Sequence, residues 1–447
     1  LVGRGSGLVI ADAAAGGGKI QSVPTDGMKV TVDPKAEWRQ IFNDAWRLQR
    51  DFFYEPTLHH VDWEEMRKRY GSMIEDCATR EDVAWVLAEL ISELNIGHAY
   101  VTSPGDVESS VPGVNVGLLG ADYALVSEDG ASAYQFAKIH SAAAWDSDAR
   151  GPLDALGIKV KEGEYLLAVN GNPVDTSKDP WAAFIGAAGK VTSVTIGSKP
   201  RFDGSEREVL LTPMGSEADV RYRAWIESKR RYVEEKSGGR IGYIYVPNTG
   251  VDGQDDLFRQ FYGQRHKEAL IIDDRWNGGG QIPTRFIELL NRPLVNMWAR
   301  RDGKDWVWPP DAHFGPKAML INGLAGSGGD MFPALFRQMK LGKLIGTRTW
   351  GGLVGITGDP DLIDGGGISV PRFAYYEKDG TWGIEGHGVD PDIEVLDDPA
   401  LMVDGGDPQI DRAVTELLNE LVANPVVFPK RPASPDRSGM GIKPEDK

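Results

Sequence analysis

The chain has 447 residues, of which 41% are hydrophobic, so it is long enough to bury the cores of several domains. Its 66 acidic residues outnumber its 49 basic ones, and the resulting formal charge of -17 argues against a nucleic-acid partner. Cys77 is the only cysteine, which excludes an intrachain disulfide framework, and no apolar stretch has the length of a membrane span. We therefore expect a cytoplasmic protein that binds no membrane.

Residues 1–33 predict short strands separated by glycine-rich turns such as Gly16-Gly17-Gly18. Two or three strands do not form a stable unit alone, so we expect either the end of an upstream all-β domain or a strand pair docked on the body. The chain starts at Leu1 without an initiator methionine or a signal peptide. This start predicts that the chain begins within a longer polypeptide.

Residues 34–106 predict a small helical domain. Asp33 and Pro34 supply an N-cap and a first-turn proline before apolar residues at helical spacing. Asp62 and Thr79 begin two further helices with the same capping pattern.

Residues 107–215 predict short strands with one helix near residues 180–185. The segment resembles a PDZ domain in residues 157–171 and in the stretch Gly117-Leu118-Leu119-Gly120, which is placed like the loop that receives a peptide carboxylate. The resemblance makes Gly117, Leu118, Leu119 and Gly120 candidates for peptide binding. A PDZ-like fold can also serve as a spacer, because peptide binding requires an exposed sheet edge beside that loop.

Residues 216–428 predict an α/β domain, in which short apolar strands alternate with helices. The expected strands are residues 240–246, 269–273, 318–321 and 343–346, and the expected helices are residues 255–264, 282–291, 329–340 and 409–423. Residues 429–447 are rich in proline, serine, glycine and charge, which predicts a disordered tail.

Ser327 lies in the turn Ala325-Gly326-Ser327-Gly328-Gly329-Asp330, directly after an apolar strand. A serine hydroxyl is a weak nucleophile until a base removes its proton and amides hold the oxyanion, and glycines allow that close backbone approach. The pattern therefore indicates a nucleophile turn. An isolated string of this kind is also compatible with a flexible loop.

Two other segments supply the groups that a serine nucleophile needs. His98 follows Gly97 where a helix end leads into a strand, which predicts that the imidazole lies on a turn; a structural role is the alternative, and His387 competes with it as the base. The glycine-rich residues 273–280 follow a buried strand and can form an anion-binding nest. A phosphate loop would need a Lys-Ser/Thr pair, which is missing.

With these segments in place, the chain resembles the tricorn protease family over roughly residues 29–423. The resemblance is carried by residues 95–100, 274–280, 326–330, 346–352 and 385–392. It implies a multidomain α+β protein with a helical domain, a PDZ domain and a crotonase/Clp-like α/β serine protease domain. It also implies that the first strands are the remnant of an upstream β-propeller.

The same resemblance implies the roles of five residues. Ser327 would be the nucleophile, His98 the general base and Glu385 the member of the tetrad that supports the histidine, with oxyanion amides from Gly280 and Gly328. The implied function is a serine endopeptidase that cleaves oligopeptides through an acyl-enzyme, downstream of proteasome-type degradation, as a homo-oligomer that is expected to be a hexamer. No metal or organic cofactor is expected, because the histidines and carboxylates show no ligand spacing.

The sequence departs from the family pattern at two places. Gly97 stands where the family archetype has a serine that bridges the histidine to the glutamate, so a water or a direct carboxylate contact replaces the bridge, or the enzyme is weakened. Loss of an orienting group costs up to about four orders of magnitude in rate. Residues 294–299 carry no acid where the archetype has an aspartate that selects basic P1 side chains, and we expect a hydrophobic P1 preference instead.

Three other classes of protein share parts of this pattern. A carboxy-terminal processing protease shares the PDZ-plus-α/β plan, but Gly352 stands where its catalytic lysine would be. An acyl-CoA enzyme of the crotonase type needs neither the PDZ-like segment nor Ser327. A non-enzymatic PDZ and propeller scaffold with a decayed site is favoured by Gly97 alone.

Overall fold

The computed structural model describes residues 2–4, 7–11, 18–25, 27–103, 113–435 and 445. The chain forms two compact units: unit 1 comprises Leu1–Val107 and Gly355–Ala374, and unit 2 comprises Glu108–Val354 and Tyr375–Lys447. The predicted tail beyond residue 435 lies outside the described residues except for residue 445. None of the helices in the described ranges is long and apolar enough to cross a bilayer.

Unit 1 contains the helices predicted for its sequence. They are α1 (Pro34–Phe52), α2 (Trp63–Met73) and α3 (Arg80–Ser92), with a short 3-10 turn, η1 (Leu58–His60). The predicted caps are confirmed: the side chains of Asp33, Asp62 and Thr79 accept hydrogen bonds from the first backbone amides of α1, α2 and α3. The first strands, β1 (Val2–Arg4), β2 (Gly7–Ala11) and β3 (Ile20–Val23), form an antiparallel sheet.

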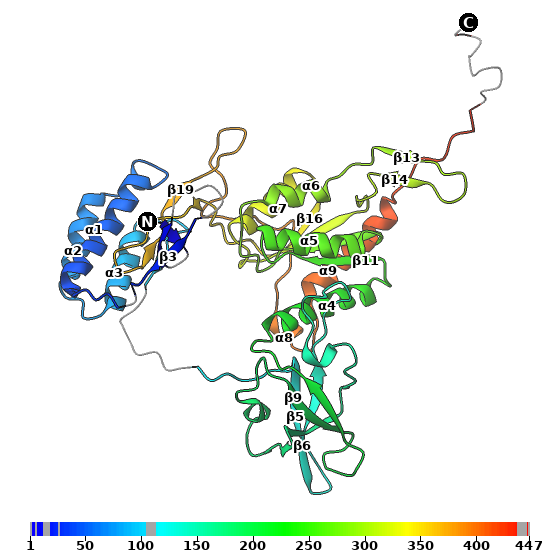
Figure 1. Ribbon diagram of the computed structural model, residues 1–447. Coiled ribbons are helices and arrows are strands. Elements are labelled where there is room, and N and C mark those ends of the chain that lie inside the picture. The colour runs from blue at the N-terminus through cyan, green and yellow to red at the C-terminus, as the bar shows by residue number, and fades with distance from the viewer. Residues whose placement is uncertain are drawn as a thin grey trace. The chain divides into compact units, whose positions relative to one another are not determined.

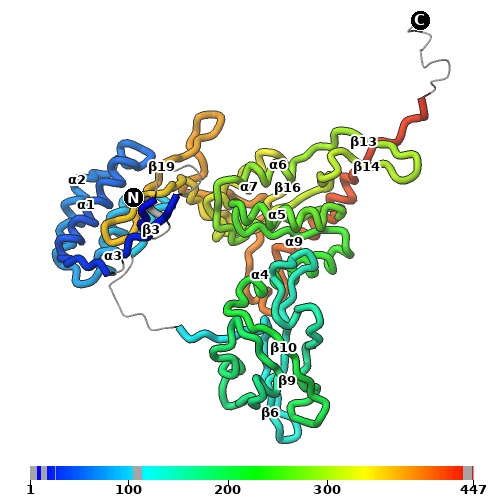
Figure 2. Tube along the Cα trace, viewed as in Figure 1, coloured from blue at the N-terminus to red at the C-terminus, as the bar shows by residue number. Residues whose placement is uncertain are grey.

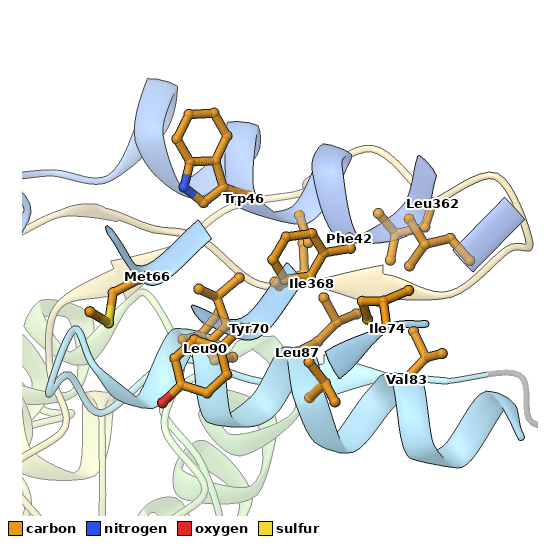
Figure 3. Packing of buried hydrophobic residues seen from close by; sticks show 14 of the residues in the cluster. Phe42, Trp46, Met66, Tyr70, Ile74, Val83, Leu87, Leu90, Leu362 and Ile368 are labelled. Carbon is orange, nitrogen blue, oxygen red and sulfur yellow. The ribbon is translucent and has the colours of Figure 1, made fainter. Parts of the chain in front are cut away.

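The core of unit 1 includes a segment from much later in the chain. Leu362 and Ile368 are buried among the apolar side chains of α1, α2 and α3, as Figure 3 shows around Phe42 and Leu87. Figure 2 shows the segment of β19 beside α1 and α3. Residues 355–374 lie within the segment predicted as catalytic, yet they pack with the helices of unit 1.

Residues 355–374 also pair with the strand that follows α3. They contain β17 (Gly355–Ile356), β18 (Gly367–Ile368) and β19 (Pro371–Phe373). Strand β18 pairs antiparallel with β4 (Val101–Thr102), and β17 pairs with β19. The buried Arg80 side chain donates to the Asp364 carboxylate over 2.5 Å, which fixes the segment to the start of α3.

Unit 2 begins with the PDZ domain. Its strands are β5 (Ala121–Glu128), β6 (Ala131–Ile139), β7 (Tyr165–Val169), β8 (Asn172–Pro173), β9 (Thr192–Gly197) and β10 (Arg207–Leu211). They form a sheet in the order β10-β9-β7-β6-β5, with β8 paired to β7. The helix predicted near residues 180–185 is the 3-10 helix η3 (Pro180–Phe184), and another 3-10 turn is η2 (Pro152–Asp154).

The rest of unit 2 is a three-layer α/β domain (Figure 1). Its parallel sheet has the order β11 (Ile241–Tyr245), β12 (Ala269–Asp273), β15 (Lys317–Ile321), β16 (Gly342–Gly346) and β20 (Ile393–Glu394). Helices α5 (Val251–Gln264), α6 (Pro283–Leu290) and α7 (Gly328–Gln338) cover one face, and α4 (Ala218–Lys236) and α9 (Pro408–Ala423) cover the other. Helix α4 was not predicted from the sequence.

Successive strand residues face opposite layers, as the two-residue period of a strand requires. Ile244 packs toward α5, whereas Tyr243 and Tyr245 pack toward α4 and α9. The hairpin β13 (Asn296–Trp298) and β14 (Trp306–Trp308) and the short helix α8 (Pro399–Met402) complete the domain.

The Arg80–Asp364 pair predicts how strongly residues 355–374 are held. Asp364→Asn removes the carboxylate to which the buried Arg80 side chain donates, and we expect the free energy of unfolding to fall by about 3 kcal/mol. Urea unfolding followed by tryptophan fluorescence measures it. The matched control is Glu75→Gln, which removes the partner of Arg39 in a half-exposed pair and should barely move the midpoint. Equal effects of both variants would contradict this account.

Candidate active site

The loops that follow β11, β12, β15 and β16 meet at one edge of the sheet. These strands are parallel neighbours, so their carboxyl ends lie side by side, which is where open α/β sheets place their sites. The Thr249 amide donates to Gly279 O over 2.8 Å, the Gly326 amide to Asn277 O over 3.0 Å, and the Trp350 amide to Ala325 O over 2.9 Å. Backbone hydrogen bonds thus join each loop to the next.

Ser327 occupies a strained backbone conformation at the start of α7. Its φ of 58° and ψ of -116° lie outside the regions that non-glycine residues favour. Its side chain is half-buried, while Gly326 and Gly328 on either side are buried. Ser327 is therefore the partly exposed residue of a turn whose neighbouring glycines are buried.

Asp330 holds this turn, a role that sequence reasoning missed. One carboxylate oxygen accepts from the Ser327 amide over 2.7 Å, and the other accepts from the Gly351 amide over 2.7 Å. Burial raises the pKa of the Asp330 carboxyl against the effect of its hydrogen bonds, and the charge of Glu385 acts in the same direction as burial. The sequence signal for this role is an acidic residue three positions after the helix cap, here Asp330 after Ser327, which is the pattern of a capping box.

The glycine loop after β12 packs directly against the serine turn. A Cβ on Gly279, whose φ is +89°, would lie 2.7 Å from the Ser327 Cβ. A Cβ on Gly328 would lie 2.7 Å from Gly280 N. Within the described residues, the amides of Gly280 and Gly328 donate to no other group, so both are available to an incoming acceptor.

Arg275 fixes the base of this glycine loop. Its fully buried guanidinium donates to both carboxylate oxygens of Asp273, over 2.9 and 2.6 Å, and to both of Asp407, over 3.1 and 3.0 Å. The Gln409 side chain accepts a further bond over 3.0 Å. The Asn277 side chain then positions the loop itself, because its oxygen accepts from the Gly279 amide over 2.8 Å.

Glu385 lies on the loop after β16 rather than on a strand. Its carboxylate accepts from the amides of Leu353 and Val354 over 2.5 and 2.7 Å, and the next amide, of Gly386, donates to Gly351 O over 2.7 Å. Unit 2 therefore brings together four of the predicted residues, which are Ser327, Gly280, Gly328 and Glu385.

His98 lies in unit 1. As predicted, it occupies a turn between α3 and β4, where its side chain is buried. The Ser369 hydroxyl donates to His98 O over 3.0 Å and accepts from the Tyr100 amide over 2.7 Å. The competing His387 is exposed and contacts Asp390 over 2.8 Å.

Three of the four residues of the predicted peptide-binding loop donate their backbone amides to groups within unit 2. The Gly117 amide donates to Phe184 O over 2.9 Å, and the Leu118 amide donates to Met214 O over 2.8 Å. The Gly120 amide donates to the Glu217 carboxylate over 2.9 Å, and Leu119 is buried. A peptide carboxylate would have to displace these bonds to bind there.

The structure also bears on the alternative of a carboxy-terminal processing protease, which would have a catalytic lysine at the position of Gly352. A Cβ on Gly352, the residue at the lysine position, would lie 2.2 Å from the ring of Trp350. That ring also covers Gly326, whose Cβ would lie 2.5 Å from it. The space that a lysine would need is filled. Across the described ranges, no group of three or more His, Cys, Asp or Glu side chains could hold a metal ion.

Residues 240–395, which form most of the α/β domain, match the family described as Peptidase family S41. Residues 34–92 match the Tricorn protease C1 domain, and residues 117–216 match the Tricorn protease PDZ domain. Over most of its length the chain resembles the C-terminal half of the tricorn protease family. The expected PDZ domain is thereby confirmed.

Individual relatives agree with this assignment. The chain is 37% identical over 90% of its length to Tricorn protease homolog 1 of Streptomyces coelicolor, of which it covers 37%. It is 34% identical over 92% of its length to the Putative Tricorn-like protease C-terminal subunit of Sulfurisphaera tokodaii, of which it covers 46%. The crystal structure of the tricorn protease matches 90% of the chain with a TM-score of 0.81 and 31% identity, and 38% of that protein is covered. The chain thus spans less than half of these relatives.

The contact between Gly279 and Ser327 predicts the effect of a single methyl group. Gly279→Ala should lower the rate of Ser327 modification by a fluorophosphonate by about a hundredfold or more, because the methyl would displace the serine. The control is Gly380→Ala, which has a similar φ of +84° and open space around it. Both variants carry the cost of a positive φ, so a similar loss of labelling in both would refute the steric explanation.

Proposed function

We propose that this chain is a serine endopeptidase that cleaves oligopeptides through an acyl-enzyme. The observation that carries the proposal is the convergence, in unit 2, of a strained and half-exposed Ser327 with two amides, of Gly280 and Gly328, that donate to no other described group. A nucleophile beside unused donors is the arrangement that acyl transfer requires. The match of residues 240–395 to Peptidase family S41 supports it.

In the proposed reaction, His98 removes the proton from Ser327 Oγ as this oxygen bonds to the peptide carbonyl carbon. The carbonyl oxygen becomes an oxyanion that accepts from the Gly280 and Gly328 amides, each worth about 3 kcal/mol of barrier. The carbon–nitrogen bond then breaks, and protonated His98 gives its proton to the leaving amine. A water molecule, deprotonated by His98, releases the acyl group and restores Ser327.

Glu385 is proposed to stabilise the protonated histidine. Because its carboxylate accepts two backbone amides, it is fixed in place, which lowers the reorganisation needed when the imidazole becomes charged. Gly97 has no side chain to bridge histidine and carboxylate. A water or a direct carboxylate contact is proposed to take that part.

The family resemblance also supports proposals on location, oligomeric state and the source of the peptides. We propose a cytoplasmic homo-oligomer, expected to be a hexamer, that receives peptides downstream of proteasome-type degradation. The sheet of β1, β2 and β3 is proposed as the remnant of an upstream propeller. We propose that the terminal strands, the helical domain, the PDZ domain and the α/β domain end at residues 33, 106, 215 and 428. We also propose peptide binding by residues 117–120, which requires a peptide to displace the bonds that the Gly117, Leu118 and Gly120 amides make within unit 2.

Labelling by a fluorophosphonate separates the enzyme from a decayed scaffold. We expect the full chain to be labelled at Ser327, with no labelling of Ser327→Ala and at least a hundredfold slower labelling of His98→Ala, because a general base contributes about that much. His387→Ala is the matched control and should react like the wild type, since its ring contacts Asp390 on the surface. An unlabelled wild-type chain would favour the scaffold.

The P1 preference can be tested with fluorogenic peptides that differ only in that residue. Because residues 294–299 carry no acid, peptides with Leu or Phe at P1 should show a kcat/KM at least about tenfold above the Arg peptide. A peptide with Asp at P1 controls for a general dislike of charge. A strong preference for Arg would refute the expectation while leaving the proposed chemistry intact.

A further inference from the structure

Thr249 carries a buried hydroxyl that the proposed mechanism does not use. The residue is fully buried in the loop after β11, and its Oγ1 makes no hydrogen bond within the described part of the chain. Its backbone is fixed on both sides, because its amide donates to Gly279 O over 2.8 Å and its carbonyl accepts from the Ile282 amide over 3.0 Å. The hydroxyl is therefore held in one place without a partner.

The Thr249 hydroxyl lies beside Gly280 and Gly328, whose amides are the proposed oxyanion donors. A Cβ on Gly328 would lie 2.0 Å from Thr249 Oγ1 and 2.7 Å from Gly280 N, so the hydroxyl lies beside the backbone of Gly328, where that backbone meets Gly280. A Cβ on Gly280 would lie 2.3 Å from the carbonyl carbon of Thr249. The Thr249 backbone thus lies against Gly280, and its Oγ1 lies against Gly328.

A buried hydroxyl without a partner lowers stability, so its presence beside a site calls for an explanation. A hydroxyl can donate to an acceptor that arrives with the substrate, and a donor aimed at the developing oxyanion gains strength in the transition state. The alternative is that Thr249 serves only through its methyl group, in which case valine, which has the same shape, would serve as well.

Resting on the proposed function, we propose that the Thr249 hydroxyl is a third donor to the reacting carbonyl oxygen of the peptide. It supplements the Gly280 and Gly328 amides and accepts no proton from the substrate. The interaction strengthens as the carbonyl oxygen becomes an oxyanion, so it lowers the barrier more than it tightens substrate binding.

The test compares Thr249→Val, which keeps the shape and removes the hydroxyl, with Thr249→Ser, which keeps the hydroxyl. In the full chain, Thr249→Val should lower kcat by about ten- to a hundredfold with KM changed less than about threefold, and should weaken a peptide aldehyde that forms an oxyanion by a similar factor. Thr249→Ser should keep kcat within about threefold of the wild type. The Tm of Thr249→Val should not fall, because a buried unpaired hydroxyl is removed.

The control is Ser193→Ala, which removes another buried hydroxyl without a described partner, in β9 of the PDZ domain, and should leave kcat unchanged. Three results would overturn the inference: an unchanged kcat in Thr249→Val, equal losses in the Val and Ser variants, or a kcat loss accompanied by a lower Tm. A wild-type chain that neither cleaves peptides nor reacts with a fluorophosphonate would overturn the proposed function together with this inference. An active wild type with an unchanged Thr249→Val overturns this inference alone.

Discussion

Direct contact between backbones at the carboxyl edge of the sheet is the constraint on which the site of unit 2 depends. At Gly280 and Gly328, any side chain would meet neighbouring backbone or Thr249 within 2.0 to 2.7 Å. The loops can approach this closely only because the glycines have no Cβ, and Gly280 also adopts a φ of +144°. Amides held in this way would need no rearrangement when the proposed oxyanion develops, and such preorganisation is the main source of oxyanion stabilisation.

A buried network of charged side chains around Arg275 makes this edge of the sheet rigid. Arg275 connects Asp273, at the end of β12, to Asp407, which caps α9, and Lys229 of α4 donates to the same Asp407 over 3.1 Å. A buried ion pair contributes little net stability, but loss of one partner is costly because it leaves an uncompensated charge. The network therefore fixes one arrangement of the donor loop, and residues near the end of the α/β domain determine its position.

Much of the fold could be predicted because short apolar runs bounded by glycine mark the strands β11, β12, β15 and β16. The caps at Asp33, Asp62 and Thr79 likewise fixed the starts of the helices in unit 1. The glycine-rich loop and the serine turn were recognisable because close backbone approach requires those residue types locally.

Other parts of the site depend on contacts that no local pattern encodes. Thr249 becomes part of the site only because β11 is placed beside β12, and Asp330 only because the loop after β16 returns to meet it. Residues 355–374 gave no periodic signal, since their strands are two or three residues long and their buried side chains, Leu362 and Ile368, face a core formed by residues far away in sequence.

Residues 355–374 take the chain from unit 2 into unit 1 and back. The chain leaves unit 2 after Val354, whose amide donates to Glu385, and returns at Tyr375, whose carbonyl and hydroxyl accept from the amides of Gly383 and Ile384. Both crossing points are thus fixed beside the carboxylate proposed to support the base.

Residues 355–374 also bind the turn that carries His98. Strand β18 pairs with β4, and the Ser369 hydroxyl binds the backbone of His98 and Tyr100. One continuous segment therefore contacts the histidine turn in unit 1 and begins and ends at the Glu385 loop in unit 2. Because the segment is packed in the core of unit 1 and Ser369 binds the His98 backbone, loosening the segment would disturb the turn that carries His98, although His98 lies outside it.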